Sequence, residues 1–320
     1  TAEAPVAYSP RRTVLDKLLV DAALEAGVEV REGFIVEDIL IQDGRVTGVR
    51  VHGKAGHTVT EHARVVIGAD GRHSIVAKAG RIEHYNEKPR FQASYYTYWS
   101  GLPMNGRCET YIRPERGFAA WPTNDDLTLI ICGWPFAEFE AYKKDIEANY
   151  LKTIELVPPF ADRLRAATRQ ARFVGTAVAN YFRKPYGPGW ALVGDAGYKK
   201  DFITAQGIHD AFRDAKLCAT ALDETFSGAR PFDIAMSDYQ STRDDRVLPM
   251  YEFTTDLATL KSPPPNLQRL LEAMHGNQEA MDGFARVNAG VTSPDEFFSD
   301  ENVGRIFASS SNPRLLRGDM

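Results

Sequence analysis

Residues 190–197 read WALVGDAG and residues 205–208 read AQGI, and these two segments decide the fold. The apolar run predicts a buried strand that ends at Gly194-Asp195, and Gly207 is expected to begin a helix. A strand end followed by a helix start in this way places a carboxylate and the amino end of a helix where both can contact one ligand. The carboxylate accepts hydrogen bonds from sugar-type hydroxyls, whereas the free N–H groups and the helix dipole favour negative charge. A flavin nucleotide offers both kinds of group, through its ribityl chain and its pyrophosphate or reduced ring.

The composition is that of a soluble globular protein. With 320 residues, of which 43% are hydrophobic and 25% charged, the chain can bury the core of one large or two ordinary domains. A net charge of −5 provides no basic field, which argues against a nucleic-acid partner. No run reaches membrane-spanning length and no leader is visible, so a cytoplasmic location is expected. Cys108, Cys132 and Cys218 are odd in number and set among apolar residues, and we expect buried free thiols.

Residues 1–80 mix helix and strand as an α/β nucleotide-binding domain does. Leucine and alanine recur at helical spacing from Leu15 to Ala26, which predicts a helix with a core-facing stripe that ends at Gly27. Three β segments are expected after it: a short strand at Val28–Val30, a hairpin of Phe34–Ile41 and Arg45–Val51 across Asp43-Gly44, and an apolar strand at Ala63–Ala69.

The rest of the chain changes character twice. Residues 91–134 are rich in aromatic and β-branched residues broken by turn formers, which predicts several antiparallel strands. Residues 136–170 are expected to be helical with a break at Pro158-Pro159, and Arg172–Phe182 to be a strand. An apolar stripe from Ile208 to Leu222 predicts a helix, and the remainder is expected to be mostly helical with an extended linker at Ser262–Pro265.

The extended pattern around Gly194-Asp195 strongly resembles the second flavin-contacting motif of the p-hydroxybenzoate-hydroxylase-like flavoprotein monooxygenases. The segment Gly194-Asp195-Ala196-Gly197 is followed, after seven residues, by Ala-Gln-Gly-Ile and then by Asp214-Ala215 in an apolar helix. The resemblance implies that Asp195 contacts ribityl or pyrophosphate-linked hydroxyls of FAD. It also implies that N–H groups at the helix start face the pyrimidine end of the isoalloxazine and stabilise the reduced flavin. The residues concerned there are Ala205, Gln206, Gly207 and Ile208.

A second stretch, from Val66 to Ala77, is similar to the Asp-Gly motif of the same family. This resemblance implies that Asp70 and Gly71 lie beside the flavin pyrophosphate and help reduction by a nicotinamide. An ordinary strand with an Asp-Gly turn is the alternative interpretation. Lys78 departs from the family, which often has arginine there.

Two further positions resemble cofactor contacts of the family. Arg12 begins an Arg-x-x-Leu pattern with Leu19 further on, and the family's arginine at this helix start reaches the flavin. Its neighbour Arg11 could take the same part. Val36 follows Gly33 in a strand that resembles the one whose backbone pairs with the adenine edge.

Three departures from the family matter. Phe202 stands where the family usually has proline, and Ala205 stands where it usually has glycine, so Phe202 is expected to shape the flavin or substrate pocket. No Gly-x-Gly-x-x-Gly occurs in the chain, although in this family that loop opens the protein and cradles the pyrophosphate. Residues 1–80 match what normally follows that first βαβ unit. The resemblance therefore implies that the unit is missing through truncation or is supplied separately.

The resemblance implies an α/β fold, α+β overall, in which a Rossmann-like FAD-binding domain carries an inserted antiparallel substrate domain and C-terminal helices. The FAD-binding domain is predicted at residues 1–80 and 186–225, the substrate domain at 81–185 and the helical region at 226–320. Because a pocket over a flavin is dry, alternate side chains of the antiparallel strands are candidate substrate contacts. With Phe202, these candidates are Tyr96, Tyr98, Phe118 and Trp121.

The family implies a monooxygenase in which NADPH or NADH reduces FAD, O₂ adds to form a flavin C4a-hydroperoxide, and one oxygen atom enters an aromatic or polycyclic substrate. No side chain stands out as a general base, so the catalytic residues remain unassigned. A reductase like the geranylgeranyl reductases is an alternative with the same motifs. A non-catalytic interaction module is a third, which the missing glycine loop favours. The motifs do not specify an oligomeric state.

Other chemistries lack their motifs. His52, His57 and His62 are spaced five apart, which provides no zinc-type pairing, so no metal site is predicted. No Gly-x-Ser-x-Gly elbow of an α/β-hydrolase and no Trp-x-Trp-x-Ile-Pro segment of a flavin-dependent halogenase occurs in the chain.

Overall fold

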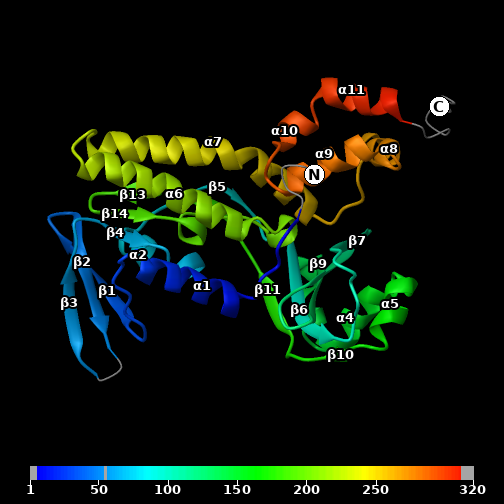
Figure 1. The fold of residues 1–320 in the computed structure, drawn as a ribbon, viewed down its shortest axis with the longest axis horizontal. Helices are drawn as coiled ribbons and strands as arrows, with labels where there is room; N and C mark the ends of the chain where they lie inside the picture. The colour runs from blue at the N-terminus through cyan, green and yellow to red at the C-terminus, as the bar shows by residue number, and fades with distance from the viewer. Residues whose placement is uncertain (1–5, 54–55, 311–320) are drawn as a thin grey trace. The chain divides into compact units, whose positions relative to one another are not determined.

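The computed structural model describes residues 6–53 and 56–310. The chain divides into two compact units, whose helices and strands are labelled in Figure 1. We call Pro10–Arg90 with Val178–Val247 the motif unit, because it holds both predicted cofactor motifs. The sheet unit comprises Thr1–Ser9, Phe91–Ala177 and Leu248–Met320, of which residues 6–9, 91–177 and 248–310 are described.

The motif unit begins with α1 (Arg12–Glu25) and a three-stranded antiparallel sheet. Its strands are β1 (Ile35–Gln42), β2 (Arg45–His52) and β3 (Thr58–His62). Asp43 and Gly44 have φ values of 50° and 76°, which is the backbone of a tight two-residue hairpin turn. The predicted hairpin and the left-handed Gly27 after α1 are thereby confirmed. Val28–Val30 forms no strand, whereas β3 was missed because its polar alternation leaves little apolar signal.

A parallel strand pair lies at the centre of the motif unit. β4 (Val66–Gly68) pairs in parallel with β14 (Trp190–Leu192), in the register Val66↔Trp190 and Gly68↔Leu192. β13 (Tyr186–Gly187) pairs antiparallel with the other side of β14. β4 is shorter than the strand predicted at 63–69 and, among the described residues, is one of the two edge strands of this sheet. A mixed core of hairpin, strand and helix residues packs around the pair: Ile39, Val46, Val76, Trp190, Leu192 and Ala196.

The strand predicted at 172–182 is two strands in two different sheets. β11 (Val174–Ala177) pairs with a strand of the sheet unit, whereas β12 (Asn180–Arg183) pairs in the motif unit with β5 (His84–Lys88) and β15 (Tyr198–Lys199). Phe182 of β12 is fully buried, and its ring lies 5.2 Å from the ring of Tyr198. A continuous β pattern in the sequence does not reveal that its two halves have different partners, because partners are set by tertiary pairing.

The helix α1 forms as predicted, but its apolar stripe is not part of a core. None of its fourteen described residues is buried, and Leu18 and Leu19 are 60% and 40% exposed. Apolar residues at helical spacing indicate that a helix has an apolar face. They do not indicate which other element, if any, packs against that face. The expected core stripe of Leu15–Ala26 was therefore wrong for the described part of the chain.

The helix after the Gly-Asp motif, α6 (Gly207–Phe226), buries only part of the predicted stripe, namely Cys218 and Leu222. Ile208 and Phe212 of the predicted stripe are 40% and 49% exposed. The face that is buried combines charged and apolar side chains: Asp210, Asp214, Cys218, Ala221 and Leu222. Its apolar end packs against the first half of α7 (Phe232–Ala258), which runs beside α6 in Figure 1.

The sheet unit is built on an antiparallel sheet in the order β10-β6-β9-β8-β7, with β11 also paired to β6. Its strands are β6 (Gln92–Ser100), β7 (Glu109–Arg113), β8 (Arg116–Pro122), β9 (Leu127–Pro135) and β10 (Thr168–Arg169). One face packs on short helices to form the largest aromatic core of the protein, which includes Trp99, Phe118, Trp134, Tyr150 and Phe160. These helices are α3 (Phe139–Tyr142), α4 (Ile146–Glu155) and α5 (Pro158–Leu164). Pro158 and Pro159 begin α5, where proline is tolerated because the first N–H groups need no helical partner.

The C-terminal part of the sheet unit is helical, as predicted. Four helices pack around Leu270, Phe297 and Ile306. They are α8 (Pro265–Met274), α9 (Gln278–Asn288), α10 (Pro294–Phe297) and α11 (Asp300–Ser309). Together with the parallel pair, the antiparallel sheets and the remaining helix, α2 (Ile75–Ala79), this arrangement confirms the predicted α/β fold, α+β overall.

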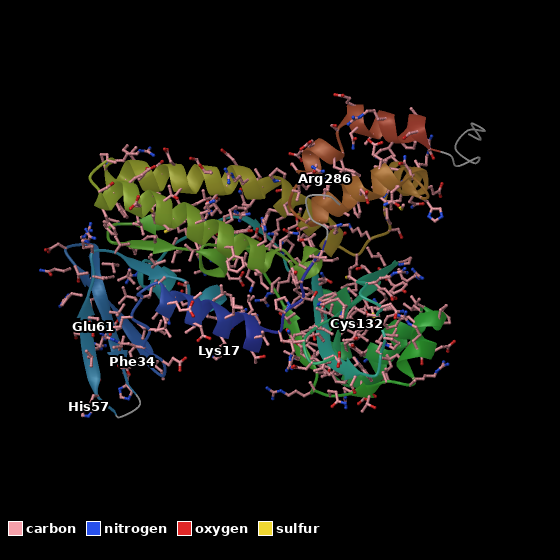
Figure 2. The ribbon with its side chains drawn as sticks, in the orientation of Figure 1. Lys17, Phe34, His57, Glu61, Cys132 and Arg286 are labelled. Atoms are coloured by element: carbon pink, nitrogen blue, oxygen red, sulfur yellow. The ribbon has the colours of Figure 1, made fainter. Side chains whose placement is uncertain are left out.

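The cysteines differ from the prediction at one position. Cys132, labelled on its strand in Figure 2, and Cys218 are buried as expected, but Cys108 is exposed. Burial raises the pKa of the Cys132 thiol well above its ordinary value, which keeps it neutral and unreactive. In the described part of the chain, no helix is both long and apolar enough to cross a membrane.

Tyr150 provides a test of the aromatic core. Its hydroxyl donates to the Ile130 carbonyl at 3.0 Å and accepts from Trp99 Nε1 at 3.3 Å, and the side chain is fully buried. Tyr150→Phe removes both of these hydrogen bonds from the buried core, so we expect a loss of about 2 kcal/mol in unfolding free energy. Urea denaturation measures it. Tyr8→Phe is the control, because Tyr8 is 86% exposed, and an equal loss in both variants would contradict the assigned hydrogen bonds.

Candidate functional site

The two predicted motifs meet at the carboxyl ends of β4 and β14. Each strand runs into a short 3₁₀ turn, η1 (Gly71–His73) after β4 and η3 (Gly194–Ala196) after β14, and the two turns pack against each other. The Val193 N–H donates to the Gly68 carbonyl at 3.1 Å and extends the strand pairing to the turn. Parallel pairing therefore brings Asp70-Gly71 and Gly194-Asp195 to one place.

Asp70 shapes the chain at this junction. Its Oδ2 accepts a hydrogen bond from the Ile75 N–H at 2.7 Å, at the start of α2. Ser74 Oγ accepts from the Ala77 N–H at 3.1 Å and caps the same helix. Gly71 has a φ of 73°, a conformation that glycine adopts without strain. Asp70 and Gly71 thus fold the first motif tightly beside the second.

Asp195 presents its carboxylate at the surface of this junction, with its side chain 50% exposed. Gly194, just before it, has a φ of 56° and lies so close to α6 that an added Cβ would be 3.2 Å from the Ala211 Cβ. A larger residue at position 194 would push the Gly-Asp turn away from the helix. The glycine of the Gly194-Asp195 motif is thus found where the backbone of the turn lies close to α6.

The start of α6 lies open next to this turn. Gln206 occupies the N-cap position and makes no side-chain hydrogen bond to the helix, and Gly207 and Ile208 are exposed. A Cβ added to Gly207 would meet no atom within 4 Å. Because the first N–H groups of a helix have no helical acceptors, this end is available to an anionic or polar ligand.

Arg12 lies close enough to Asp195 for their charges to interact, and its contact with the flavin remains a prediction. It is the first residue of α1, and its Nε lies 2.6 Å from Asp16 Oδ1. The pKa of Arg12 is raised, first by that hydrogen bond and more weakly by the charge of Asp195. Val36 lies on the edge strand β1 opposite Val51, and its contact with an adenine remains a prediction.

Several cations surround the Asp195 carboxylate. Lys199 Nζ is 3.7 Å from Asp195 Oδ2, and only 8% of the Lys199 side chain is exposed. Burial lowers the pKa of Lys199, Asp195 partly restores it, and Arg72 and Arg183 lower it further. Arg183 also donates to the Ala196 carbonyl at 2.9 Å. Positive charge from Lys199, Arg72 and Arg183 therefore lies close to the Asp195 carboxylate.

Behind the junction lies a buried charge cluster that the sequence analysis did not identify. Arg213 on α6 donates to Asp210 at 2.9 Å and to Asp214 at 3.1 Å. Lys200 pairs with Asp210 and also contacts the Tyr198 hydroxyl at 2.9 Å. Burial acts to raise the pKa of Asp210, but Lys200 and Arg213 outweigh it and hold the pKa below its ordinary value. The sequence did contain a signal for this charge cluster, because positions 210, 213 and 214 lie on one face of a helix.

The candidate substrate residues fall into three groups. Tyr96 and Tyr98 on β6 and Trp121 on β8 alternate with the core residues, so they lie on the sheet face away from the helices. Phe118 is on the opposite, helix-covered face, where its ring lies 4.9 Å from that of Phe160. Phe202 is half-buried in the turn η4 (Phe202–Thr204) of the motif unit, just before α6.

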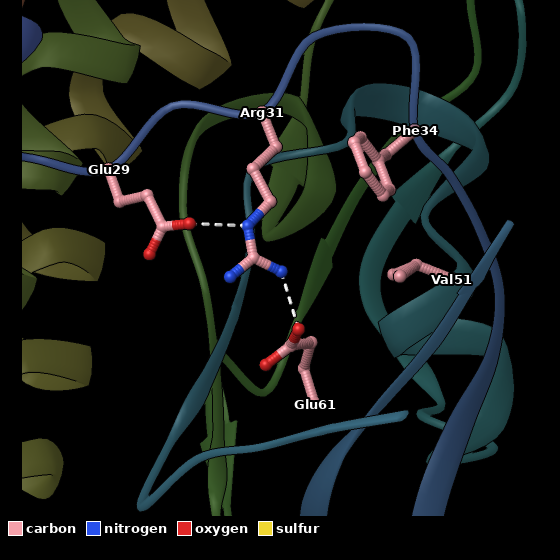
Figure 3. A pocket seen from close by; sticks show the side chains of 5 residues that line it. All are labelled: Glu29, Arg31, Phe34, Val51 and Glu61. Carbon is pink, nitrogen blue, oxygen red and sulfur yellow. Dashed lines mark hydrogen bonds and ion pairs between the residues drawn. The ribbon is translucent and has the colours of Figure 1, made fainter. Parts of the chain in front are cut away.

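Two hollows on the surface of the motif unit lie away from this junction. One of about 280 Å³ is lined by Glu29, Arg31, Phe34, Val51 and Glu61. Figure 3 shows how Arg31 spans it to reach both carboxylates, which neutralises its charge. A second, of about 510 Å³, runs along α1 at Val14 and Leu18. Neither is lined by residues of the two motifs.

The chain belongs to the FAD binding domain family, whose pattern it matches over residues 4–254. A probable NADH-specific resorcinol 4-hydroxylase from Rhodococcus jostii is 26% identical over 326 residues, covering 94% of this chain and 58% of that protein. Digeranylgeranylglycerophospholipid reductase 1 from Methanopyrus kandleri is 26% identical over 273 residues, or 83% of this chain and 70% of that protein.

Solved structures confirm the fold. The myxobacterial chondrochloren halogenase, an FAD-dependent enzyme by its description, has a TM-score of 0.72 and 23% identity, covering 94% of this chain and 73% of that chain. The chain spans only 58% and 70% of the lengths of the two curated relatives. The predicted resemblance to flavoprotein monooxygenases is confirmed at the level of the family, and FAD is the cofactor.

The residues present fit FAD. Asp195 offers a half-exposed carboxylate for hydroxyl groups, the uncapped start of α6 offers backbone N–H groups, and Lys199 and Arg12 add positive charge near Asp195. This donor set matches the polyol and the anionic parts of the cofactor.

Ala205 allows a test of the loop that leads into α6. Its φ is 54°, in the left-handed region, where a Cβ is strained and the family usually has glycine. We expect Ala205→Gly to raise the unfolding free energy by about 1 kcal/mol. Ala219→Gly, at an exposed position within α6, is the matched control and should lower it by about 1 kcal/mol. Thermal denaturation measures both, and a loss of stability in Ala205→Gly would rule out the strained conformation.

Proposed function

We propose that this protein is an FAD-dependent monooxygenase that uses NADPH or NADH and inserts one oxygen atom of O₂ into an aromatic or polycyclic organic compound. The observation that carries the proposal is the meeting of Asp70-Gly71 and Gly194-Asp195 beside the open start of α6, in a chain of the FAD binding domain family. The resorcinol hydroxylase supports hydroxylation in particular, because its alignment covers 94% of this chain.

Within this proposal each group of the junction has a role. Bound FAD would take electrons from the nicotinamide and pass them to oxygen. Asp195 would accept hydrogen bonds from the ribityl hydroxyls, and the N–H groups near Gln206, Gly207 and Ile208 would stabilise negative charge on the reduced ring. Lys199 and Arg12 balance negative charge near Asp195. Asp70 and Gly71 hold the first motif beside the pyrophosphate.

The sheet unit offers a suitable surface for an aromatic substrate. The rings of Tyr96 and Tyr98 are perpendicular, with centroids 6.2 Å apart, and Trp121 lies on the same face of the sheet. Burial raises the pKa of Tyr96, so its phenol stays protonated at neutral pH and can donate a hydrogen bond. We assign these three residues of the sheet unit to the proposed substrate surface and leave out the core residue Phe118. Phe202, in the motif unit, stays a candidate for shaping the flavin pocket.

An FAD-dependent reductase of lipid double bonds is the second candidate. It is supported by the digeranylgeranylglycerophospholipid reductase, which is 26% identical over 83% of this chain. Both candidates use the same flavin motifs. They differ in whether molecular oxygen is consumed and whether the product gains oxygen or hydrogen.

The reaction type is tested with the purified, FAD-loaded protein and a panel of phenols, including resorcinol. We expect substrate-stimulated NADH or NADPH oxidation, matched O₂ uptake and a product heavier by one oxygen atom, measured by oxygen electrode and mass spectrometry. Isotopically labelled O₂ should transfer its label to the product. Reduction of an isoprenoid double bond under anaerobic conditions, with no oxygenated product from any phenol, would instead establish the reductase.

Asp195 tests the cofactor site itself. Removing the carboxylate with Asp195→Ala removes hydrogen bonds from a charged acceptor to the ribityl chain, so FAD affinity should fall by about tenfold or more. Titration of FAD, followed by quenching of flavin fluorescence, measures the affinity. Asp223→Ala, which removes an exposed carboxylate from α6, should leave it unchanged. Unaltered affinity in Asp195→Ala would overturn the proposed site.

A further inference from the structure

A buried carboxylate holds the backbone of the Gly-Asp turn from behind. The Gly194 N–H donates to Asp214 Oδ2 at 3.2 Å, and the Asp214 side chain is 0% exposed. Gly194 directly precedes Asp195 and adopts a left-handed conformation with a φ of 56°. Asp214 therefore fixes the one backbone unit whose orientation decides where the Asp195 carboxylate points.

The same helix face also holds the second ligand-bearing segment. Arg213 bridges Asp214, at 3.1 Å, and Asp210, at 2.9 Å. Asp210 in turn pairs with Lys200, in the loop that leads from β15 into α6. Three charged residues in the first two turns of α6 thus connect the Gly-Asp turn to the loop that begins the helix.

Burying the Asp214 carboxylate costs free energy, so its presence at this position needs a physical reason. Burial raises the pKa of Asp214 above its ordinary value, and the nearby charges of Arg213 and Arg243 offset only part of that effect. A wholly apolar cluster commonly replaces such buried ion pairs without loss of stability, so ion pairing alone does not explain the carboxylate. What an apolar side chain cannot do is accept the Gly194 N–H, which would then be left without its acceptor.

We propose that Asp214 is a positioning residue for FAD, which acts through the Gly194 amide on the direction of the Asp195 carboxylate. The inference rests on the proposed function, because the ligand that Asp195 holds is the flavin cofactor. Asp214 does not touch the cofactor in this proposal. Its effect on FAD binding therefore requires Asp195 to be present.

A double-mutant cycle tests this dependence. FAD affinity is measured by fluorescence titration in the wild type, Asp214→Ala, Asp195→Ala and the double variant. Asp214→Ala should weaken binding about tenfold when Asp195 is present and less than about twofold when Asp195 is absent. Asp214→Asn should restore affinity to within about threefold of the wild type, because its amide oxygen can still accept the Gly194 N–H. Asp223→Ala is the control for loss of a carboxylate from α6.

Circular dichroism at the titration temperature confirms that each variant is folded. Should Asp214→Ala not fold, Asp214→Leu replaces it, since leucine has the same branched arrangement of heavy atoms and lacks the acceptor, and the same outcome is expected. Equal weakening by the position-214 variant with and without Asp195, or no weakening in either, would overturn the positioning role and leave the proposed function standing. Failure of the wild type to bind FAD would instead overturn the proposed function, and this role with it.

Discussion

The parallel pairing of β4 with β14 is the interaction on which the site depends. It joins only three residues of each strand, yet it brings together two turns that are far apart in the chain. Parallel strands end at the same edge of a sheet, so both turns project from one side and can address one ligand. An antiparallel pairing of the same two strands would place the Asp70-Gly71 and Gly194-Asp195 turns at opposite ends.

The helix α6 makes that junction rigid by charge as well as by apolar packing. The later turns of α6 pack Cys218 and Leu222 against α7. Its first two turns bury Asp210 and Asp214 around Arg213. Buried ion pairs add little net stability, because desolvation opposes their attraction. Their hydrogen bonds are directional, however, and these bonds fix the backbone around Gly194 and the loop before Gly207 more narrowly than apolar contacts would.

Charge and exposure are distributed unevenly over the motif unit. Arg12 and Lys199 act on the half-exposed Asp195 carboxylate, so charges of both signs gather at the junction. By contrast, Leu18 on α1 and Phe212 on α6 present apolar surface. The family membership explains the charged groups of the junction through the polyol and the anionic parts of the cofactor. The exposed apolar surface arises because no described element covers these faces of α1 and α6.

Local signals in the sequence determined the secondary structure around the site. The Gly-Asp turn, the Asp43-Gly44 hairpin, the extent of α1 and the start of α6 follow from turn chemistry, apolar periodicity and glycine positions, and each formed as expected. Only the tertiary structure decided which faces are buried, that Arg172–Phe182 serves two sheets, and that Asp214 accepts the Gly194 N–H. The physical reason is that turn and helix preferences arise within a few residues, whereas burial and hydrogen-bond partners depend on segments that meet only when the chain folds.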